Sequence, residues 1–278
     1  MTTIVTHPGS AHKDDFLSAA VLLAVLDNAE LHRREPTQTD LDDPKTYVVD
    51  VGMEYDPGRR NFDHHQDPAL PCAFHLIMQH LGYHEAASLA FVWYPHMSMI
   101  DVRGPYRTAE HLGVDSSVLF ATASTIEGYM LSIFAAVDTL GHSKLLYRFM
   151  RNLGSDMLAL IDSKMRRLEE LKVSAKVLPV KQFKAVFSDI AEDPKLAMEL
   201  YLRHLDDPRI VISITPSNRG AGWELLRLGD TPAVDFRVLN THPQVRFVHS
   251  GGFLAKTHSQ LPLPEVMALA DQAVMDGG

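Results

Sequence analysis

Short clusters of histidine and aspartate punctuate the first hundred residues of this chain, and they indicate a site for divalent metal ions. Charged groups are costly to bury unless they are paired or bound to metal. The clusters are His7 with His12, Asp14 and Asp15, then Asp50, then Asp63 with His64 and His65, and finally Asp101. Mixed imidazole and carboxylate ligands suit Mn²⁺, Zn²⁺ and Fe²⁺, and the large share of carboxylates favours Mn²⁺ or Mg²⁺.

Two such ions held close together can clamp a phosphoryl group and generate hydroxide at neutral pH. The clusters as a set therefore predict a dinuclear site that hydrolyses a phosphoester or a phosphoanhydride. Each cluster alone also has an ordinary structural explanation. For example, an aspartate at the start of a helix is commonly a cap, so we expect Asp15 to cap the helix that follows and Asp14 to bind metal. Asp50 ends an apolar run, where a carboxylate shared by both ions would lie.

The remaining clusters predict distinct roles for their members. Two adjacent histidines cannot both point the same way from a strand, so one of His64 and His65 would bind metal while the other reaches the substrate. Asp63 would orient a histidine by accepting a hydrogen bond from its ring. Asp101 follows an apolar segment and would complete the second ion's coordination. Asp138 lies in a similar context and remains an alternative, although Asp101 is nearer in sequence to the histidine pair.

The pattern of apolar residues predicts an α/β fold around these clusters. A short strand at Ile4–Thr6, a largely buried helix at Asp15–Leu26 and a buried strand at Tyr47–Val51 form a βαβ unit, which indicates an open, mainly parallel sheet. Ligands bind such sheets beyond the carboxyl ends of the strands. His7 and Asp50 both follow a predicted strand, so this edge of the sheet is the expected site.

The rest of the chain predicts a helical segment followed by a second, smaller domain. Apolar residues at helical spacing predict helices at 72–81, 86–94, 116–137, 144–153 and 155–172. Ser155 is the expected N-cap of the last of these helices, and Pro179 is expected to break the helical pattern after it. Strands are expected at 183–187, 210–214, 223–228 and 245–248, and helices at 192–204 and 263–275. These elements favour a metal-binding catalytic domain over 1–172 and a substrate-binding α/β domain with a mixed sheet over 183–278.

One segment of the second domain has the composition of an anion site. Residues 247–257 combine a strand end with His249, the glycine pair Gly251 and Gly252, and Lys256. Glycine lets backbone amides approach an anion, and the histidine and lysine of an expected loop from His249 to Lys256 would pair with phosphate oxygens. Arg219, in the turn-rich loop 217–222, is a weaker candidate for the same role.

Composition narrows the function classes and the compartment. The chain has 278 residues and a net charge of −9, which argues against sequence-independent binding of long duplex nucleic acid but leaves room for a short strand. Cys72 is the single cysteine, so no intrachain disulfide forms. No signal peptide is evident, and the longest apolar stretch, 17–26, is too short to span a bilayer. We therefore expect a cytoplasmic protein.

The order of the motifs resembles the DHH phosphoesterase superfamily, which is named for an Asp-His-His sequence like that at 63–65. Within it, the chain resembles the MYG-type exonuclease family of metal-dependent hydrolases. The motifs that carry this resemblance lie along the whole chain, at Thr6–Asp15, Val48–Pro57, Phe62–Gln66 and Phe247–Phe253.

The resemblance implies a two-domain enzyme with its active site in the cleft between the domains. One ion would be held by His7, His12 and Asp50, the other by Asp14, Asp50, His64 and Asp101, and His65 would touch the scissile phosphate. The wider superfamily has aspartate where His12 stands, and the family's Ile-Asp-x-x-Asp-Asn-Gly motif is only partly met at 100–104. These departures leave the preferred metal and the substrate open.

We therefore expect a phosphodiesterase or exonuclease that uses two divalent ions, with Mn²⁺ favoured over Mg²⁺, Zn²⁺ or Fe²⁺, and acts on short RNA or DNA or on small nucleotides. A small-molecule phosphatase or pyrophosphatase needs the same ions and is the first alternative. An inactive metal- or nucleotide-binding regulator is the second. The expected partner is a phosphoester and not a membrane, and both a monomer and a homodimer remain open.

Overall fold

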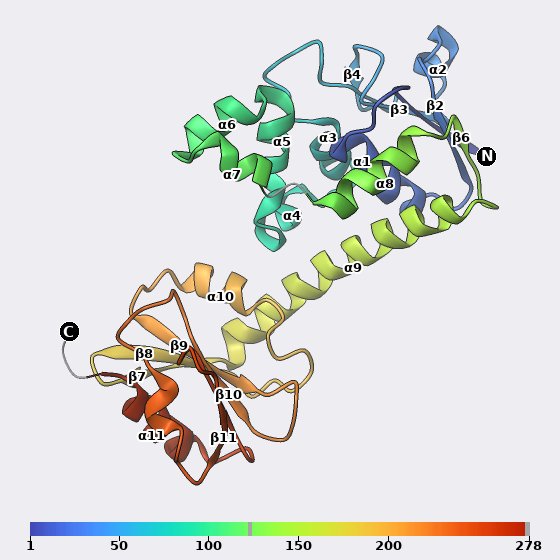
Figure 1. Ribbon diagram of the computed structural model, residues 1–278. Coiled ribbons are helices and arrows are strands. Elements are labelled where there is room, and N and C mark those ends of the chain that lie inside the picture. The colour runs from blue at the N-terminus through green and yellow to red at the C-terminus, as the bar shows by residue number, and fades with distance from the viewer. Residues whose placement is uncertain (122–123, 276–278) are drawn as a thin grey trace. The chain divides into compact units, whose positions relative to one another are not determined.

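The computed structural model describes residues 1–121 and 124–275, which divide into two compact units, Met1–Ser163 and Lys164–Gly278. Each unit is built on one six-stranded mixed sheet with helices packed against it (Figure 1). The 30-residue helix α9 (Leu145–Ser174) runs across the division. The expected α/β class with two sheets is confirmed, while the roles assigned to 1–172 and 183–278, and the cleft between them, stay predictions.

The N-terminal sheet is mainly parallel, as the βαβ pattern predicts. Its strand order is β4-β5-β3-β1-β2-β6. The strands are β1 (Thr2–Thr6), β2 (Ala29–Arg33), β3 (Thr46–Val49), β4 (Tyr55–Asp56), β5 (Asn61–Phe62) and β6 (Thr139–Leu140). The four inner strands run parallel, and the short edge strands β4 and β6 are antiparallel to their neighbours. The carboxyl ends of β1, β3 and β5 therefore meet at one edge.

Helices cover this sheet and extend beyond it. Besides α9, the N-terminal unit contains α1 (Lys13–Val25), α2 (Gln38–Asp42), α3 (Ala73–His80), α4 (His84–Ala90), α5 (Trp93–Arg103), α6 (Pro105–Leu112), α7 (Ser116–Ala121) and α8 (Thr125–Ala135). Helix α1 packs against β1, β3 and α3. Its Leu22 and Leu23 are fully buried, and each such leucine contributes about 1.5–3 kcal/mol to folding.

Several predicted helices have different bounds in the structure. The helix expected at 86–94 is two helices, α4 and α5, because the backbone at Phe91 is extended. The helix expected at 116–137 is found as α7 and α8, and its residues 122–123 lie outside the described residues. The helices expected at 144–153 and 155–172 are instead the single helix α9, so Ser155 is not an N-cap.

Gly154 lies within α9 and allows this helix to approach α1 closely. A Cβ atom at this position would overlap the backbone carbonyl of Ala20 and lie 2.9 Å from the Cα of Val21. Glycine normally weakens a helix relative to alanine. Here its lack of a side chain is what permits the packing.

We expect Gly154→Ala to destabilise the N-terminal unit by about 2 kcal/mol, because the added methyl must push two helices apart. Gly128→Ala in α8 is the matched control: nothing lies within 4 Å of its added Cβ, so this change should stabilise the unit by about 0.5–1 kcal/mol. Urea unfolding of both variants measures the difference. Equal stability changes for the two variants would contradict the close-packing role of Gly154.

The C-terminal unit contains a sheet of order β11-β12-β10-β9-β8-β7, in which only β8 and β9 are parallel. Its elements are β7 (Lys176–Val180), β8 (Phe183–Phe187), α10 (Met198–Leu205), β9 (Ile210–Pro216), β10 (Trp223–Arg227), the 3₁₀ helix η1 (Phe236–Leu239), β11 (Val245–Val248), β12 (Leu254–Thr257) and α11 (Leu263–Ala273). The helix expected at 192–204 begins only at Met198, because Asp193 and Ala197 have left-handed backbones. The helix expected at 263–275 ends at Ala273.

Alternation along β8 places side chains in two separate cores of this unit. Ala185 and Phe187 pack with residues of α11, whereas Val186 packs with residues of α9 and α10. The helical pattern ends before Pro179, as expected, and Pro179 lies within β7, an edge strand where a missing N–H is tolerated. Among residues 1–121 and 124–275, no helix is both long and apolar enough to cross a membrane.

Candidate metal centre

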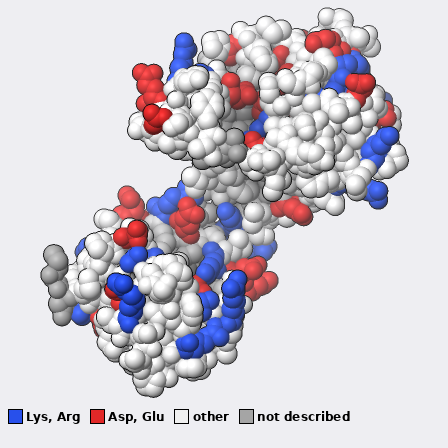
Figure 2. Space-filling view, in the orientation of Figure 1, with Lys and Arg blue, Asp and Glu red and all other residues white. Residues whose placement is uncertain are grey.

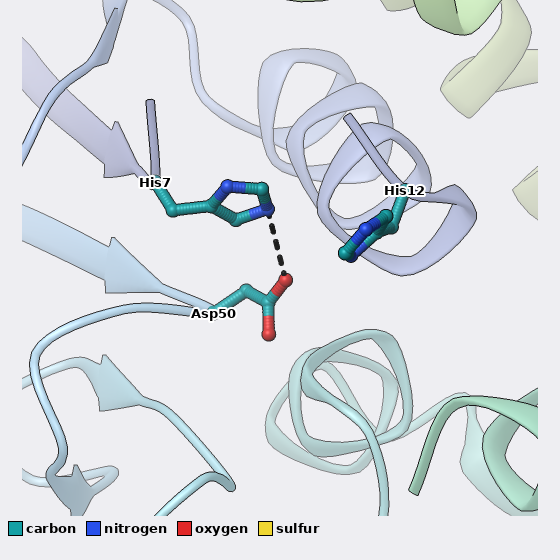
Figure 3. A group of neighbouring side chains, drawn as sticks. All are labelled: His7, His12 and Asp50. Carbon is teal, nitrogen blue, oxygen red and sulfur yellow. Dashed lines mark ion pairs between the residues drawn. The ribbon is translucent and has the colours of Figure 1, made fainter. Parts of the chain in front are cut away.

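Three neighbouring parallel strands deliver the predicted ligands to one edge of the N-terminal sheet. His7 directly follows β1, Asp50 directly follows β3, and Asp63 directly follows β5. Figure 3 shows His7, Asp50 and His12, which precedes α1, with their side chains directed toward one another. The segments that carry them are separated in sequence, but the parallel register of β1, β3 and β5 brings their ends together.

Asp50 is the central carboxylate of the cluster. One of its oxygens lies 3.4 Å from Nε2 of His7, and the other lies 3.2 Å from Nε2 of His64. The Nε2 atom of His64 also lies 3.2 Å from a carboxylate oxygen of Asp101 and 4.0 Å from one of Asp14. Asp50 itself has a left-handed backbone with φ of 59°. Its two oxygens thus face two different imidazoles, as a bridging carboxylate requires.

Several polar atoms in this cluster are buried without a hydrogen-bond partner among the described residues. They are Nε2 of His7 and of His64, both carboxylate oxygens of Asp14, and Oδ1 of Asp50. Asp14 and Asp50 are 1% and 3% exposed, so bulk water does not satisfy them. Converging buried carboxylates and imidazoles of this kind match the donors that divalent transition metals take, and the residues therefore fit a metal centre.

The described residues contain three overlapping groups that could each hold an ion. They are His7 with His12 and Asp50, Asp50 with His64 and His65, and His12 with Asp14 and Asp101, each with ligand atoms within 4.8 Å of one another. All seven residues expected at the metal site and the scissile phosphate are thus brought together. Asp138 belongs to none of these groups and is exposed, so the geometry favours Asp101 over Asp138.

The pKa values of the cluster reflect an excess of buried carboxylate. Burial and the neighbouring charge of Asp50 raise the pKa of Asp14 well above its ordinary value. Burial alone would raise the pKa of Asp50, but its pairing with His64 and His7 lowers it to about 2. Pairing with Asp50 raises the pKa of His7 to about 9. Protonated His7 and His64 thus supply positive charge that bound metal ions would otherwise supply.

Metal binding must displace these protons, since imidazole binds metal in its neutral form. Burial would lower the pKa of His64, but pairing with Asp101 and Asp50 raises it to about 10. Both histidines are therefore protonated at pH 7 in the metal-free protein, and affinity should rise with pH up to about 9. For each proton that metal binding releases, we expect the affinity for Mn²⁺ to increase about tenfold per pH unit between pH 7 and 8.5. Calorimetry in buffers of different ionisation enthalpy measures the affinity and the number of protons released. An affinity independent of pH over this range would contradict the assignment of His7 and His64 as metal ligands.

The neighbouring Asp15 has a structural role that includes orienting a ligand. The N-cap of α1 is His12, and Asp15 caps the helix from the third helical position, with its carboxylate accepting the backbone N–H of His12 at 2.8 Å. The other oxygen of Asp15 lies 3.3 Å from Nε2 of His7. Asp15 therefore links the two ends of the turn that carries His7 and His12.

Arg33, which the sequence reasoning did not single out, secures the same turn from β2. Its guanidinium donates to the carbonyls of Gly9 and Ser10 and lies 3.5 Å from Asp15. The side chain is 1% exposed and also lies over the ring of Phe134. The alternation of side chains along residues 29–33 could have identified β2 from the sequence. In the structure, buried and half-buried side chains alternate along this strand, and Arg33 lies on the buried face.

Asp63 fixes the position of the second histidine. Its Oδ1 accepts the backbone N–H groups of His64 and His65 and lies 2.7 Å from Nδ1 of His65, while Oδ2 accepts the N–H of Met53. The Nδ1 atom of His65 thus donates to Asp63, which leaves Nε2 for another partner. The side chain of His65 is 54% exposed, so this histidine is oriented and also accessible.

The residues expected to bind substrate form a separate group in the C-terminal unit. A cavity of about 470 Å³ is lined by Arg219, Arg246, Phe247, His249, Leu254 and Lys256. Figure 2 shows Lys and Arg side chains gathered on this unit. Lys256 is not in a loop but in β12, opposite Glu224 of β10, with its Nζ 2.9 Å from the buried Glu224 carboxylate. The expected lysine and histidine thus face one cavity.

The glycine pair beside this cavity forms a closed turn. The N–H of Gly251 donates to Nδ1 of His249, and the N–H of Gly252 donates to the His249 carbonyl. Gly252 has φ of +70°, and a Cβ there would overlap the carboxylate of Asp235. Both amides are therefore used within the turn, so an anion here would contact side chains.

Comparison with known protein families finds a match over the segment that carries most of the metal cluster. Residues 3–98 match the family MYG1_exonuc, described as an uncharacterised protein family (UPF0160). Over 66 residues the chain is 47% identical to a protein from Rattus norvegicus named MYG1 exonuclease, a match that covers 23% of this chain and 16% of the rat protein. The family match includes His7, His12, Asp14, Asp50 and His64, and it ends before Asp101.

Similarity to solved structures is low but covers nearly the whole chain. RecJ from Thermus thermophilus, solved in complex with Mn²⁺, is 13% identical with a TM-score of 0.34, and the match covers 98% of this chain and 51% of RecJ. An uncharacterized protein from Helicobacter pylori is 10% identical with a TM-score of 0.27, over 98% of this chain and 99% of that protein.

Proposed function

We propose that this protein is a metal-dependent phosphoester hydrolase of the DHH type, with a dinuclear centre that prefers Mn²⁺. One observation carries the proposal: imidazole and carboxylate atoms of His7, Asp14, Asp50 and His64 converge while buried, and several of them have no well-formed hydrogen bond among the described residues. A cluster so rich in carboxylate is costly to fold without cations.

The residues of the cluster divide into ligands and groups that orient them. We assign His7, His12 and Asp50 to one ion and Asp14, Asp50, His64 and Asp101 to the other. When bound, two divalent ions polarise a phosphoryl oxygen and supply a nucleophile at neutral pH. His65, held at Nδ1 by Asp63, contacts the scissile phosphate through its exposed ring, from which a phosphate oxygen accepts a hydrogen bond. Asp15 and Arg33 hold the ligand turn in place.

We further propose that the substrate is a phosphodiester of a short nucleic acid or a small nucleotide. The name of the rat relative, MYG1 exonuclease, supports this class of substrate. The cavity of the C-terminal unit supports it, because Arg219, Arg246, His249 and Lys256 are suited to binding phosphate groups. The net charge of −9 argues against long duplexes as substrates.

A substrate panel tests this function. The purified full chain is incubated with Mn²⁺ and, separately, a dinucleotide, a single-stranded oligonucleotide, a nucleoside monophosphate and pyrophosphate. We expect turnover of the dinucleotide or the oligonucleotide and its loss on chelation. Turnover of pyrophosphate or the monophosphate alone would instead support a phosphatase, and no turnover of any substrate with two ions bound would support a regulator.

A further inference from the structure

A cavity of about 580 Å³ adjoins the metal cluster within the N-terminal unit. It is lined by Ala11, His12, Lys13, Asp14, Met97, Ile100, Asp101, Gly104, Pro105, Leu119, Glu127 and Leu131. Three of these, His12, Asp14 and Asp101, are the candidate ligands that lie within 4.8 Å of one another. A substrate whose phosphate reaches these ligands would therefore place an adjacent group in this cavity.

Apart from Lys13 and Glu127, the rest of the wall is mainly apolar and comes mostly from four consecutive helices. Met97 and Ile100 of α5, Pro105 of α6, Leu119 of α7 and Leu131 of α8 line it. An apolar wall gives no hydrogen bonds to a phosphate, which would lose its hydration there. The volume lies within the range of about 300–1,000 Å³ that is usual for small-molecule sites and exceeds what a phosphate group alone would fill.

The charged pair at this cavity argues against a second phosphate. Lys13 is the one lysine or arginine among the lining residues, and its Nζ lies 3.0 Å from the carboxylate of Glu127. The pair is therefore close to neutral as a unit. Pyrophosphate or a polyphosphate would meet apolar side chains and a neutralised lysine on this side of the metal cluster.

We infer that this cavity binds the nucleoside next to the scissile phosphate, with the base against Leu131, Ile100 and Met97. This inference rests on the proposed phosphodiesterase function and adds that the active site selects substrates with a nucleoside next to the scissile phosphate. The substrate is then recognised by the metal ligands at its phosphate and by apolar contact at its base. The contact depends on shape and apolar surface, so it accepts more than one base.

The first test compares substrates in the wild-type protein. A dinucleotide is compared with analogues that lack the base on one side or the other. We expect loss of one of the two bases to lower kcat/KM by about tenfold or more, the usual scale for an apolar group in a pocket. Equal kcat/KM values for the dinucleotide and both abasic analogues would overturn the inference while leaving the proposed function intact. No turnover of any of the three would count against the proposed function itself.

The second test changes the wall. Leu131→Gln keeps the side-chain size but adds polar atoms to the cavity, and Ile126→Gln is the matched control, because Ile126 is on the same helix and 76% exposed. We expect L131Q to raise KM for the dinucleotide by about tenfold and to leave the weaker abasic analogue unchanged, with no effect of I126Q. Equal effects of L131Q on all substrates would overturn the inference.

A binding measurement gives a readout that is independent of turnover. Calorimetry with the Mn²⁺-loaded protein compares a nucleoside 5′-monophosphate with ribose 5-phosphate, and a nucleoside 3′-monophosphate with ribose 3-phosphate. We expect one of the two nucleotides to bind the wild type about tenfold more tightly than its ribose phosphate, and this difference to be lost in L131Q. If neither nucleotide binds the wild type more tightly than its ribose phosphate, the cavity does not hold the base.

Discussion

Asp50→Asn is expected to lower kcat for phosphodiester hydrolysis by at least about 10³-fold, the largest effect of any single substitution in this chain. The carboxylate of Asp50 faces His7 with one oxygen and His64 with the other, so its two oxygens are placed to serve two ions. An amide cannot carry the charge that a shared ligand needs. Steady-state kinetics with saturating Mn²⁺ measures the loss.

Asparagine is the informative replacement because of the backbone at this position. Asp50 has φ of 59°, a conformation that asparagine adopts about as readily as aspartate but that alanine strains. D50N therefore removes the charge while retaining the turn after β3, and its far-ultraviolet circular dichroism should match that of the wild type.

Two further variants test whether Asp101 or Asp138 binds the second ion. Asp101→Asn should lower kcat about 10²-fold or more, because Asp101 contacts His64. Asp138→Asn is the matched control and should keep activity within about twofold, since Asp138 is exposed and lies in none of the possible metal groups. Full activity in D50N, or a loss in D138N comparable to that in D101N, would contradict the assignment.

Asp14→Asn is expected to stabilise the metal-free protein at pH 8 and to weaken the metal-loaded one. The carboxylate of Asp14 is buried, has no hydrogen-bond partner in the part of the chain that the structure describes, and lies among other carboxylates. Its replacement by a neutral amide should raise the free energy of unfolding of the N-terminal unit by on the order of 1–3 kcal/mol without metal. With Mn²⁺ at a hundredfold excess over Kd, each occupied site adds about 2.7 kcal/mol to the wild type, and D14N forfeits part of that gain.

The pH dependence of the metal-free protein follows from the same residue. Burial and the charge of Asp50 raise the pKa of Asp14 in the folded protein above its unfolded value of 3.8. The folded state therefore holds this proton more tightly than the unfolded state, and the stability present below about pH 3.8 is lost as the pH rises through the raised pKa. D14N should lack this loss, so its advantage over the wild type grows with pH.

Thermal unfolding with and without Mn²⁺ measures both effects, and a shift of about 2–4 °C per kcal/mol is expected for a unit of this size. Asp138→Asn again serves as the control and should shift neither curve appreciably. If D14N lowers the melting temperature of the metal-free protein, or gains as much from Mn²⁺ as the wild type, Asp14 is not a strained metal ligand.

The sequence could predict the positions of the ligands along the sheet better than the helices around them. His7 and Asp50 follow apolar strands, and the carboxyl ends of neighbouring parallel strands lie side by side. The same argument extends to the histidine pair, although the two-residue strand β5 that precedes it is too short for its periodicity to show. The approach of Asp101 depends on how α5 packs, which local pattern does not determine.

The helix boundaries depended only partly on local signals. Pro95 lies in the first turn of α5, where a missing N–H is tolerated, and marks the break at Phe91, where an extended backbone separates α4 from α5. Conversely, Gly154 and Ser155 suggest a boundary, but the helix continues because Gly154 packs against α1. The lysine of the glycine-rich segment was expected in a loop, yet Lys256 lies in a strand whose partner Glu224 is far away in sequence.

The claim that this cluster seats two divalent ions is tested most directly by an anomalous difference map from crystals of the Mn²⁺-loaded protein. We predict two peaks per chain, about 3.5–4 Å apart, with the Asp50 carboxylate between them and His7 and His64 on opposite sides. The absence of any peak within ligand distance of His7, Asp14, Asp50 and His64 would contradict the account, as would a single peak that leaves Asp50 bound on one side.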